Sequence, residues 1–214
     1  MSDEDTESLR NRKKRATRLA ISNIATRLFV ERGFDNVTVA EIADAANVAK
    51  MTVFNYFPRK EDLFFDREEE GRTLVRAALG NRSPGESPIA ALHRLSRELT
   101  ERKHPFAKFT AATANFWQTV RLSPALSARA REMRDEFVDE LADLIADSAG
   151  KPAGDPPADL AAGLLVAAWI AAYTDGLRRQ RAGAAAGAAR TAFLNLIDRG
   201  FKGAAACLKG TAYE

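Results

Sequence analysis

Residues 37–60 read VTVAEIADAANVAKMTVFNYFPRK, and this stretch predicts the fold of the N-terminal part of the chain. Thr38 is followed three residues later by Glu41, which is the spacing of a capping box. In such a box the threonine hydroxyl accepts from the glutamate N–H, and the glutamate carboxylate accepts from the threonine N–H. Asn47 tolerates the left-handed conformation in which many helices end. The pattern therefore predicts a short helix over residues 38–45 that ends in a tight turn.

A second short helix is predicted over residues 49–56, and Pro58 stops it. Val53 and Phe57 stand four residues apart and share one face, so we expect both side chains to be buried. The side chains that point elsewhere are polar, basic or large: Lys50, Met51, Thr52, Asn55 and Tyr56. A helix–turn–helix whose second helix exposes such groups is the shape that enters the major groove of DNA.

Over about residues 14–65 the chain resembles the TetR family of bacterial transcriptional regulators. The resemblance rests on four segments in the family's order and spacing: ERGF at 31–34, TVAEIA at 38–43, VAKMTVFNYF at 48–57 and PRKEDL at 58–63. It implies a DNA-binding domain of three helices, followed by a helical domain that binds an effector and forms a homodimer. Beyond about residue 80 the sequence offers only a compatible helical pattern.

The positive charge of the chain is concentrated on the segment that carries the helix–turn–helix. The formal net charge is +3. Residues 1–7 hold four acidic side chains, whereas residues 8–60 hold eleven basic and only four acidic ones, so the remainder is neutral. A DNA-binding surface needs such a region, because its cations must neutralise phosphates. A solvated basic tail is the alternative interpretation of the run taken alone.

Helical periodicity and the positions of glycine and proline predict an all-α fold of about nine helices with no strand. The predicted helices cover residues 10–33, 38–45, 49–56, 59–79, 88–104, 105–121, 124–148, 158–181 and 188–208. We expect three regions: a disordered acidic tail over 1–9, the helix–turn–helix DNA-binding domain over 10–58, and a helical effector-binding and dimerisation domain over 59–214.

The predicted DNA-binding residues lie on or beside the two short helices. They are Thr38, Lys50, Met51, Thr52, Phe54, Asn55, Tyr56 and Lys60. Lys50 can donate to guanine O6 and N7, and the Thr52 hydroxyl can serve a base or a phosphate. Met51 either contacts a thymine methyl group or is an exposed filler. The resemblance implies that Tyr56 and Lys60 bind the DNA backbone, and the threonine cap of the first short helix can add a phosphate contact.

Two positions depart from the family pattern. Phe54 stands where the family usually has a tyrosine that binds a phosphate, so one backbone contact is lost or replaced. Ala49 stands where a serine usually caps the second helix, and alanine forgoes a cap worth about 1 kcal/mol. DNA or packing must then hold that turn. Whether these two residues weaken DNA binding stays open.

The last two predicted helices, over 158–181 and 188–208, are long, rich in alanine and amphipathic. Small residues let helices approach closely, and the resemblance implies that this pair from each subunit forms a four-helix dimer interface. The predicted interface residues are Leu164, Ala168, Ala171, Leu194, Ile197 and Phe201. A helical hairpin within one chain is the alternative. A symmetric dimer suits a helix–turn–helix that binds two half-sites about one DNA turn apart.

Aromatic side chains are frequent in the helices that surround the effector pocket in the family. The predicted pocket residues are Phe106, Phe109, Asn115, Phe116, Trp117, Phe137, Trp169 and Tyr173. For each aromatic residue taken alone, packing in a core is the better interpretation. Together they indicate that a pocket is mostly apolar, so an uncharged or flat hydrophobic molecule suits it better than a phosphate or a metal ion.

The composition argues against several other classes of protein. Cys207 is the only cysteine, and His93 and His104 are the only histidines, so we expect no disulfide framework, no metal site and no cofactor. We predict no catalytic residues, since the sequence has no glycine-rich phosphate loop and no nucleophile elbow. We expect no membrane partner, because the longest apolar stretch, residues 160–173, is short of a bilayer span. The N-terminus has no export signal, so a cytoplasmic location is expected.

The sequence therefore predicts a homodimeric transcriptional repressor that binds a palindromic double-stranded DNA operator. A small, mostly hydrophobic effector would release it. The alternative is a sequence-independent architectural DNA-binding protein. Such a protein has no need of a neutral helical domain of about 150 residues with an aromatic interior.

Overall fold

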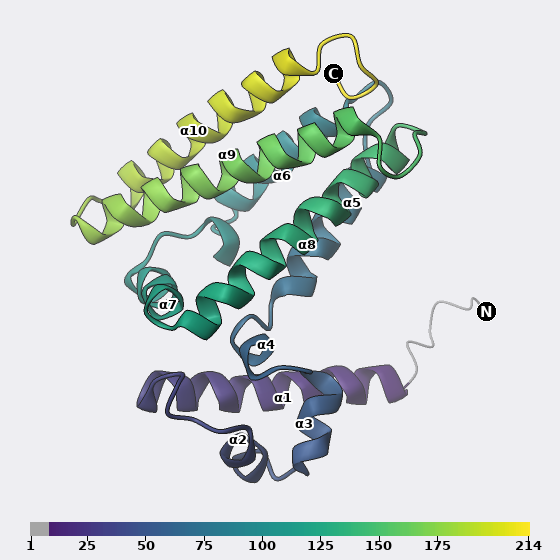
Figure 1. Ribbon diagram of the computed structural model, residues 1–214. Helices are drawn as coiled ribbons and strands as arrows, with labels where there is room; N and C mark the ends of the chain where they lie inside the picture. The colour runs from purple at the N-terminus through teal and green to yellow at the C-terminus, as the bar shows by residue number, and fades with distance from the viewer. Residues whose placement is uncertain (1–8) are drawn as a thin grey trace. The chain divides into compact units, whose positions relative to one another are not determined.

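The computed structural model of the chain describes residues 9–214, and every regular element within that range is a helix (Figure 1). The predicted all-α fold is thus confirmed. The predicted acidic tail lies, except for its last residue, outside the described residues. The chain divides into two compact units: unit 1 contains the residues up to Glu68 together with Arg121–Arg129, and unit 2 contains Glu69–Val120 and Ala130–Glu214.

The helices follow one another with short connections. In chain order they are α1 (Leu9–Arg32), α2 (Val39–Ala45), α3 (Lys50–Tyr56), α4 (Lys60–Phe64), α5 (Glu68–Gly80), α6 (Pro88–Glu101), the 3₁₀ turn η2 (Pro105–Ala107), α7 (Ala111–Leu122), α8 (Pro124–Ser148), α9 (Pro156–Arg181) and α10 (Ala186–Cys207). Within unit 1, Figure 1 shows α2 and α3 on one side of α1. Within unit 2, α9 lies antiparallel beside α10 (Figure 1).

Unit 1 is built around α1, which packs against α2 and α4. α1 stops at Gly33, whose φ of 82° is a left-handed conformation that glycine adopts without strain. The buried apolar residues of this unit are Ile21, Ala25, Leu28, Phe29, Phe34, Val37, Ile42, Ala43, Val53, Phe57, Leu63 and Leu126. The core therefore joins α1 to both helices of the helix–turn–helix.

A segment distant in the sequence completes unit 1. It comprises residues 121–129, at the end of α7 and the start of α8, and its Leu126 is fully buried. The buried Ser123 hydroxyl donates to the Asp35 carboxylate at 3.1 Å. One apolar and one polar contact therefore attach the start of α8 to the region of the helix–turn–helix.

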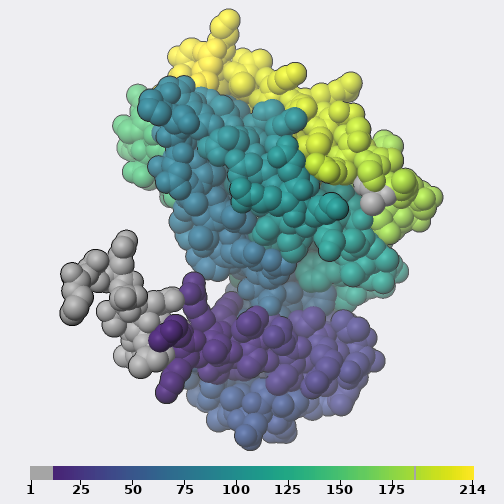
Figure 2. All heavy atoms as spheres, turned by 180° about the vertical axis from the view of Figure 1, so that it is seen from behind, coloured from purple at the N-terminus to yellow at the C-terminus, as the bar shows by residue number. Residues whose placement is uncertain are grey.

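The core of unit 2 contains residues of every helix from α5 to α10, and small residues let α9 approach its neighbours closely. A Cβ atom added to Gly200 of α10 would lie 2.3 Å from the Cβ of Ala168 in α9. A Cβ atom added to Gly176 of α9 would lie 2.4 Å from the ring of Phe109. On the face shown in Figure 2, the blue and teal residues of α6 lie beside the yellow residues of α10.

The single helix predicted over residues 59–79 is wrong, because the structure has α4 and α5 with a break between them at residues 65–67. The sequence of the break is Phe-Asp-Arg, without glycine or proline, so local propensity gives no signal for it. The carboxylate of Asp66 accepts from the buried hydroxyl of Ser22 in α1. A tertiary contact of unit 1 thus accompanies the break.

The helix predicted over residues 105–121 begins later than expected. Residues 105–107 form a 3₁₀ turn, and α7 starts at residue 111. Thr110 and Thr113 cap this start reciprocally: the Thr113 N–H donates to the Thr110 hydroxyl at 3.2 Å, and the Thr110 N–H donates to the Thr113 hydroxyl at 2.9 Å. This threonine pair was the local signal for the true start of the helix.

The expectation that no segment is apolar enough to span a bilayer is revised for α9. By length and composition alone α9 could cross a membrane, and it is the one such helix among residues 9–214. Seven of its apolar residues lie in the core of unit 2: Ala158, Ala161, Ala162, Leu165, Val166, Ala172 and Leu177. A core helix passes the same test, so length and composition alone do not assign α9 to a membrane.

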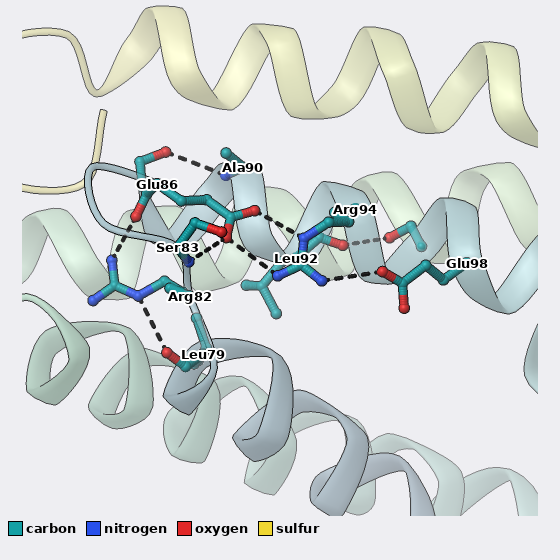
Figure 3. Close-up of polar contacts among 10 residues, drawn as sticks. Leu79, Arg82, Ser83, Glu86, Ala90, Leu92, Arg94 and Glu98 are labelled. Atoms are coloured by element: carbon teal, nitrogen blue, oxygen red, sulfur yellow. Dashed lines mark hydrogen bonds and ion pairs between the residues drawn. The ribbon is translucent and has the colours of Figure 1, made fainter.

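Hydrogen bonds of two arginines fix the loop between α5 and α6 (Figure 3). Arg82 donates to the carbonyl oxygens of Leu79 at 3.2 Å and Glu86 at 3.0 Å. The Glu86 carboxylate accepts from the N–H of Ser83 at 3.0 Å and from Arg94 of α6 at 2.9 Å. The hydrogen bond from Arg94 and the one from Ser83 lower the pKa of the Glu86 carboxyl. The start of α6 is therefore held in place.

Candidate nucleic-acid interface

The capping box predicted at the start of α2 is confirmed. Thr38 Oγ1 accepts from the Glu41 N–H at 3.2 Å, and Glu41 Oε2 accepts from the Thr38 N–H at 2.8 Å. Arg32, the last residue of α1, donates to Glu41 Oε1 at 2.9 Å. The hydrogen bonds from Thr38, and then the charge of Arg32, lower the pKa of the Glu41 carboxyl. The start of α2 is thus fixed to the end of α1, while Thr38 itself stays exposed.

The turn between α2 and α3 has the predicted conformation. Asn47 has a φ of 52°, in the left-handed region. The N–H of Val48 donates to the Ala43 carbonyl at 3.0 Å, which closes the turn. Ala49 is the N-cap of α3 and makes no side-chain hydrogen bond, so the first turn of α3 has no side-chain cap. The geometry of this turn therefore comes from the backbone and from packing.

α3 has one buried face and one open face. Val53 and Phe57 are 0% and 1% exposed, so the predicted buried face is confirmed. The remaining predicted residues on this helix divide by exposure: Lys50, Met51, Phe54 and Asn55 are exposed, whereas Thr52 and Tyr56 are half-buried. A helix fixed along one side and open along the other can be inserted into a groove of DNA.

Arg18 of α1 contacts the C-terminal end of α3, and sequence reasoning did not single it out. Its Nη1 donates to the Tyr56 carbonyl at 2.6 Å. Its guanidinium carbon lies 4.2 Å from the centroid of the Phe57 ring. The only sequence signal for Arg18 was its place in a basic run. The contact itself has no local signature, because the partner carbonyl lies 38 residues away.

Lys60, the first residue of α4, is half-buried rather than solvated. Its Nζ lies 4.2 Å from the centroid of the Phe34 ring and 5.9 Å from that of Phe29. A cation is attracted to the faces of aromatic rings. Desolvation lowers the pKa of the ammonium group, against the opposing effect of nearby carboxylates, of which Asp35 is the largest. The ammonium group thus lies against the Phe34 ring of unit 1.

Unit 1 also carries exposed positive charge outside α3. Four consecutive basic side chains near the start of α1 are exposed: Arg12, Lys13, Lys14 and Arg15. On α3, Lys50 lies with its Nζ 5.8 Å from the centroid of the Phe54 ring. Such charges supply the electrostatic part of binding to a phosphate backbone.

Five aromatic rings lie together in unit 2, and four of them belong to the predicted pocket set. The ring centroids of Phe109 and Tyr173 are 5.4 Å apart, and those of Trp117 and Tyr173 are 6.2 Å apart. Phe193, which was not predicted for the pocket, lies 5.4 Å from Phe109 and 5.2 Å from Trp169. Burial raises the pKa of the Tyr173 hydroxyl. These five rings are called the aromatic cluster below.

The other predicted pocket residues have different surroundings. The Phe116 ring lies at the edge of the aromatic cluster, 5.5 Å from Trp117. Phe106 packs 5.0 Å from the imidazole two residues before it, and Phe137 lies 5.9 Å from the guanidinium of an arginine in α5. Asn115 is exposed. The structure therefore brings together only part of the predicted set.

Two predicted dimer residues are buried within the single chain. Ile197 is 0% exposed and Phe201 is 5% exposed, so neither offers side-chain surface to a second subunit. Ala168 packs against Gly200 of the same chain. α9 and α10 thus pack against each other within the chain. Other apolar residues of α9 stay exposed or half-buried, and two of them, Leu164 and Ala171, were predicted for the dimer interface. The α9 stripe is the name used below for Leu160, Gly163, Leu164, Ala167, Ile170 and Ala171.

The helix–turn–helix is similar to those of known regulators. Residues 21–66 match the family described as bacterial regulatory proteins, tetR family. The chain is also 36% identical over 84 residues to the HTH-type transcriptional regulator TcmR of Streptomyces glaucescens. This alignment covers 39% of the chain and 37% of TcmR, so the chain matches little more than a third of the length of that curated relative.

Two solved structures share the fold of nearly the whole chain. Native NalD, described as the secondary repressor of the MexAB-OprM multidrug efflux pump in Pseudomonas aeruginosa, is 21% identical, with a TM-score of 0.54 over 88% of this chain and 97% of NalD. A second structure of NalD is 20% identical, with a TM-score of 0.52 over 90% of this chain and 97% of that chain. At this level of identity the similarity concerns the fold alone.

Proposed function

Because this chain belongs to the TetR family of bacterial transcriptional regulators, we propose that it represses transcription as a homodimer bound to a palindromic double-stranded DNA operator. The observation that carries the proposal is the two-sided α3. Val53 and Phe57 fix one side of this helix in the core, while the opposite side exposes Lys50 and Met51. That arrangement is the one a recognition helix needs in the major groove.

The open face of α3 supplies the groups that read bases. Lys50 is at the first helical position, where an exposed ammonium can donate to guanine O6 and N7. Met51 is 69% exposed, and its side chain can pack on a thymine methyl group. Asn55 lies exposed one turn further along, and an asparagine can pair with adenine N6 and N7. These three side chains would set the preferred sequence.

Residues around α3 would hold the DNA backbone. Thr38, Thr52 and Tyr56 offer hydroxyl groups, and Lys60 offers an ammonium group, which are all suited to phosphate oxygens. Phe54 has no hydrogen-bonding group, so a backbone contact usual in the family would be absent there. The exposed basic side chains near the start of α1 would add contacts that do not depend on sequence.

We assign the dimer contact to the α9 stripe, in place of the buried Ile197 and Phe201. The stripe contains the exposed large side chains Leu160 and Ile170, separated by small residues that allow close helix contact. Ala167→Glu would place a charge in that contact and should give monomers that bind the operator weakly. Ala77→Glu, at an exposed alanine of α5, is the matched control. Light scattering that finds Ala167→Glu still dimeric would move the interface elsewhere.

We assign effector binding to the neighbourhood of the aromatic cluster, with a small, mostly hydrophobic molecule as the ligand. An effector can weaken DNA binding only if it prefers the conformation in which the two α3 helices are badly spaced for the operator. Trp117 and Trp169, the two tryptophans of the chain, both belong to this cluster. A thermal-shift screen of apolar metabolites, followed by tryptophan fluorescence, tests the assignment.

The alternative is an architectural protein that binds DNA of any sequence. A gel-shift titration with the DNA upstream of the protein's own gene, against scrambled DNA of equal length, separates the two. A repressor should prefer the upstream DNA by about 10³-fold or more. A ratio near one would favour the architectural protein. Neither proposal includes a catalytic reaction, a cofactor or a membrane, and both place the protein in the cytoplasm.

A further inference from the structure

The recognition helix depends on contacts from outside itself for its position. α3 has seven residues, which is far shorter than a helix that is stable alone in water. Its N-cap, Ala49, provides no side-chain hydrogen bond. The position of α3 must therefore depend on packing along the helix and on contacts at its C-terminal end.

Arg18 supplies the polar contact at that C-terminal end. The Tyr56 carbonyl belongs to the last residue of α3, and Arg18 Nη1 donates to it at 2.6 Å. The carbonyls of a last turn have no partner within the helix, and a cation is favourable there because of the helix dipole. One hydrogen bond thus satisfies a terminal carbonyl of α3 and ties it to α1.

The same guanidinium also stacks on the residue that ends α3. Its central carbon lies 4.2 Å from the centroid of Phe57, whose side chain is 1% exposed. A planar guanidinium can stack and donate at once, whereas the ammonium of lysine has no plane to stack. Arg18 is half-buried, unlike the exposed basic residues that precede it, such as Lys14.

We propose that Arg18 is a positioning residue of the recognition helix: it sets how α3 lies against α1, and it acts on DNA affinity through α3 rather than through a phosphate. The part of this inference that concerns DNA affinity rests on the proposed function. Its structural part, that Arg18 orders α3, holds for the free protein. The basic run around Arg18 suggests the opposite role, a direct phosphate contact, and the two roles differ in measurable ways.

The test uses the full chain with Arg18→Met and Arg18→Lys, and Lys14→Met as the control on the same helix. The first measurement is hydrogen exchange of the amides of residues 53–57 in the DNA-free protein. Arg18→Met should raise these exchange rates at least tenfold, and Arg18→Lys should raise them less. Lys14→Met should leave them unchanged. Amides of α2 should be unaffected in all three variants.

The second measurement is the salt dependence of Kd for the duplex that the wild-type chain binds most tightly. Loss of a charge-assisted hydrogen bond should raise Kd about tenfold to a hundredfold in Arg18→Met. The base preference and the slope of log Kd against log salt should stay as in the wild type, because no phosphate contact is lost. Loss of one phosphate contact would instead lower the slope by about 0.9.

Unchanged exchange at residues 53–57 would overturn the inference. A slope lowered by about 0.9 would also overturn it, because Arg18 would then contact a phosphate directly. If Arg18→Met does not fold, Arg18→Lys decides by the same readouts, because it keeps the charge and most of the side-chain length. If the wild-type chain binds no duplex specifically, the proposed function fails, and the exchange measurement still decides whether Arg18 orders α3.

Discussion

Arg129 of α8 donates from Nε to Asp62 Oδ1 of α4 at 2.9 Å, while Asp62 Oδ2 accepts from the Arg59 N–H at 3.1 Å. One carboxylate therefore caps α4 and holds the start of α8 at the same time. The side chains of Arg129 and Asp62 are only 12% and 17% exposed, so salt screens this pair less than the exposed pairs.

Arg129→Met should destabilise unit 1 by about 2 kcal/mol, the usual value for a hydrogen bond to a charged group. Asp62→Ala should cost about 1 kcal/mol more, because the cap of α4 is lost as well. Hydrogen exchange of the α4 amides reports the loss locally. Arg134→Met is the control, since Arg134 pairs with Asp135 on the exposed part of the same helix. Its loss should lower the free energy of unfolding by less than about 1 kcal/mol. Equal effects of Arg129→Met and Asp62→Ala would contradict the double role of the carboxylate.

Lys60→Ala should weaken DNA binding by a similar factor on every sequence and should lower the salt slope by about 0.9, because it removes one phosphate contact. It should also lower the stability of unit 1 by about 0.5–1 kcal/mol through loss of the contact between Lys60 and Phe34. Lys60→Arg, which keeps the charge, serves as the control in the same salt titration. A change of preferred sequence in Lys60→Ala would assign this residue to the bases instead.

Gly200→Ala and Gly203→Ala should have opposite effects on stability, although both glycines lie in α10. The new Cβ at Gly200 would lie 2.3 Å from the Cβ of Ala168, so α9 and α10 would have to separate at a cost of about 1–3 kcal/mol. The new Cβ at Gly203 meets nothing within 4 Å, and alanine stabilises a helix by up to about 1 kcal/mol relative to glycine. Urea unfolding of the two variants measures both changes in the free energy of unfolding. Two stabilised variants would show that α9 and α10 are less closely packed.

Tyr213→Phe should remove a contribution to stability that depends on pH. Burial, and then the hydrogen bond to Asp155 at 2.5 Å, raise the pKa of the Tyr213 hydroxyl to about 12. An unfolded tyrosine has a pKa of about 10. The neutral phenol is therefore favoured in the fold, and its contribution is complete below about pH 10 and is lost as the pH rises towards 12. Unfolding free energies from pH 8 to 11.5 should show the difference between wild type and Tyr213→Phe shrinking above pH 10. A constant difference would contradict the raised pKa.

The helix–turn–helix could be predicted from the sequence because its signals are local. The Thr38–Glu41 cap, the left-handed Asn47 and the uncapped Ala49 each involve residues a few positions apart. The break between α4 and α5 could not be predicted, because Asp66 is bound by Ser22, which lies 44 residues earlier. The contact of Arg18 with α3 could not be predicted for the same reason, because its partner is a distant backbone carbonyl, which has no signature in the sequence.

The periodicity of α9 and α10 does not say which of their apolar residues pack within the chain and which remain available to a second subunit. Ile197 and Phe201 of α10 face the core, and Ile170 of α9 stays 44% exposed. The aromatic residues of unit 2 show the same limit, because rings on α7, α9 and α10 meet only through the tertiary fold.

Selection of binding sites from a randomised DNA library, run in parallel with the wild-type chain and with Lys50→Ala, tests the central claim most directly. If two copies of α3 read DNA as a symmetric pair, the wild type will enrich an inverted repeat whose half-sites lie about one helical turn, roughly 10 base pairs, apart. Lys50→Ala should keep the spacing and lose the preference at one position in each half-site. A wild type that enriches no sequence, or a Lys50→Ala selection with an identical motif, would contradict the account.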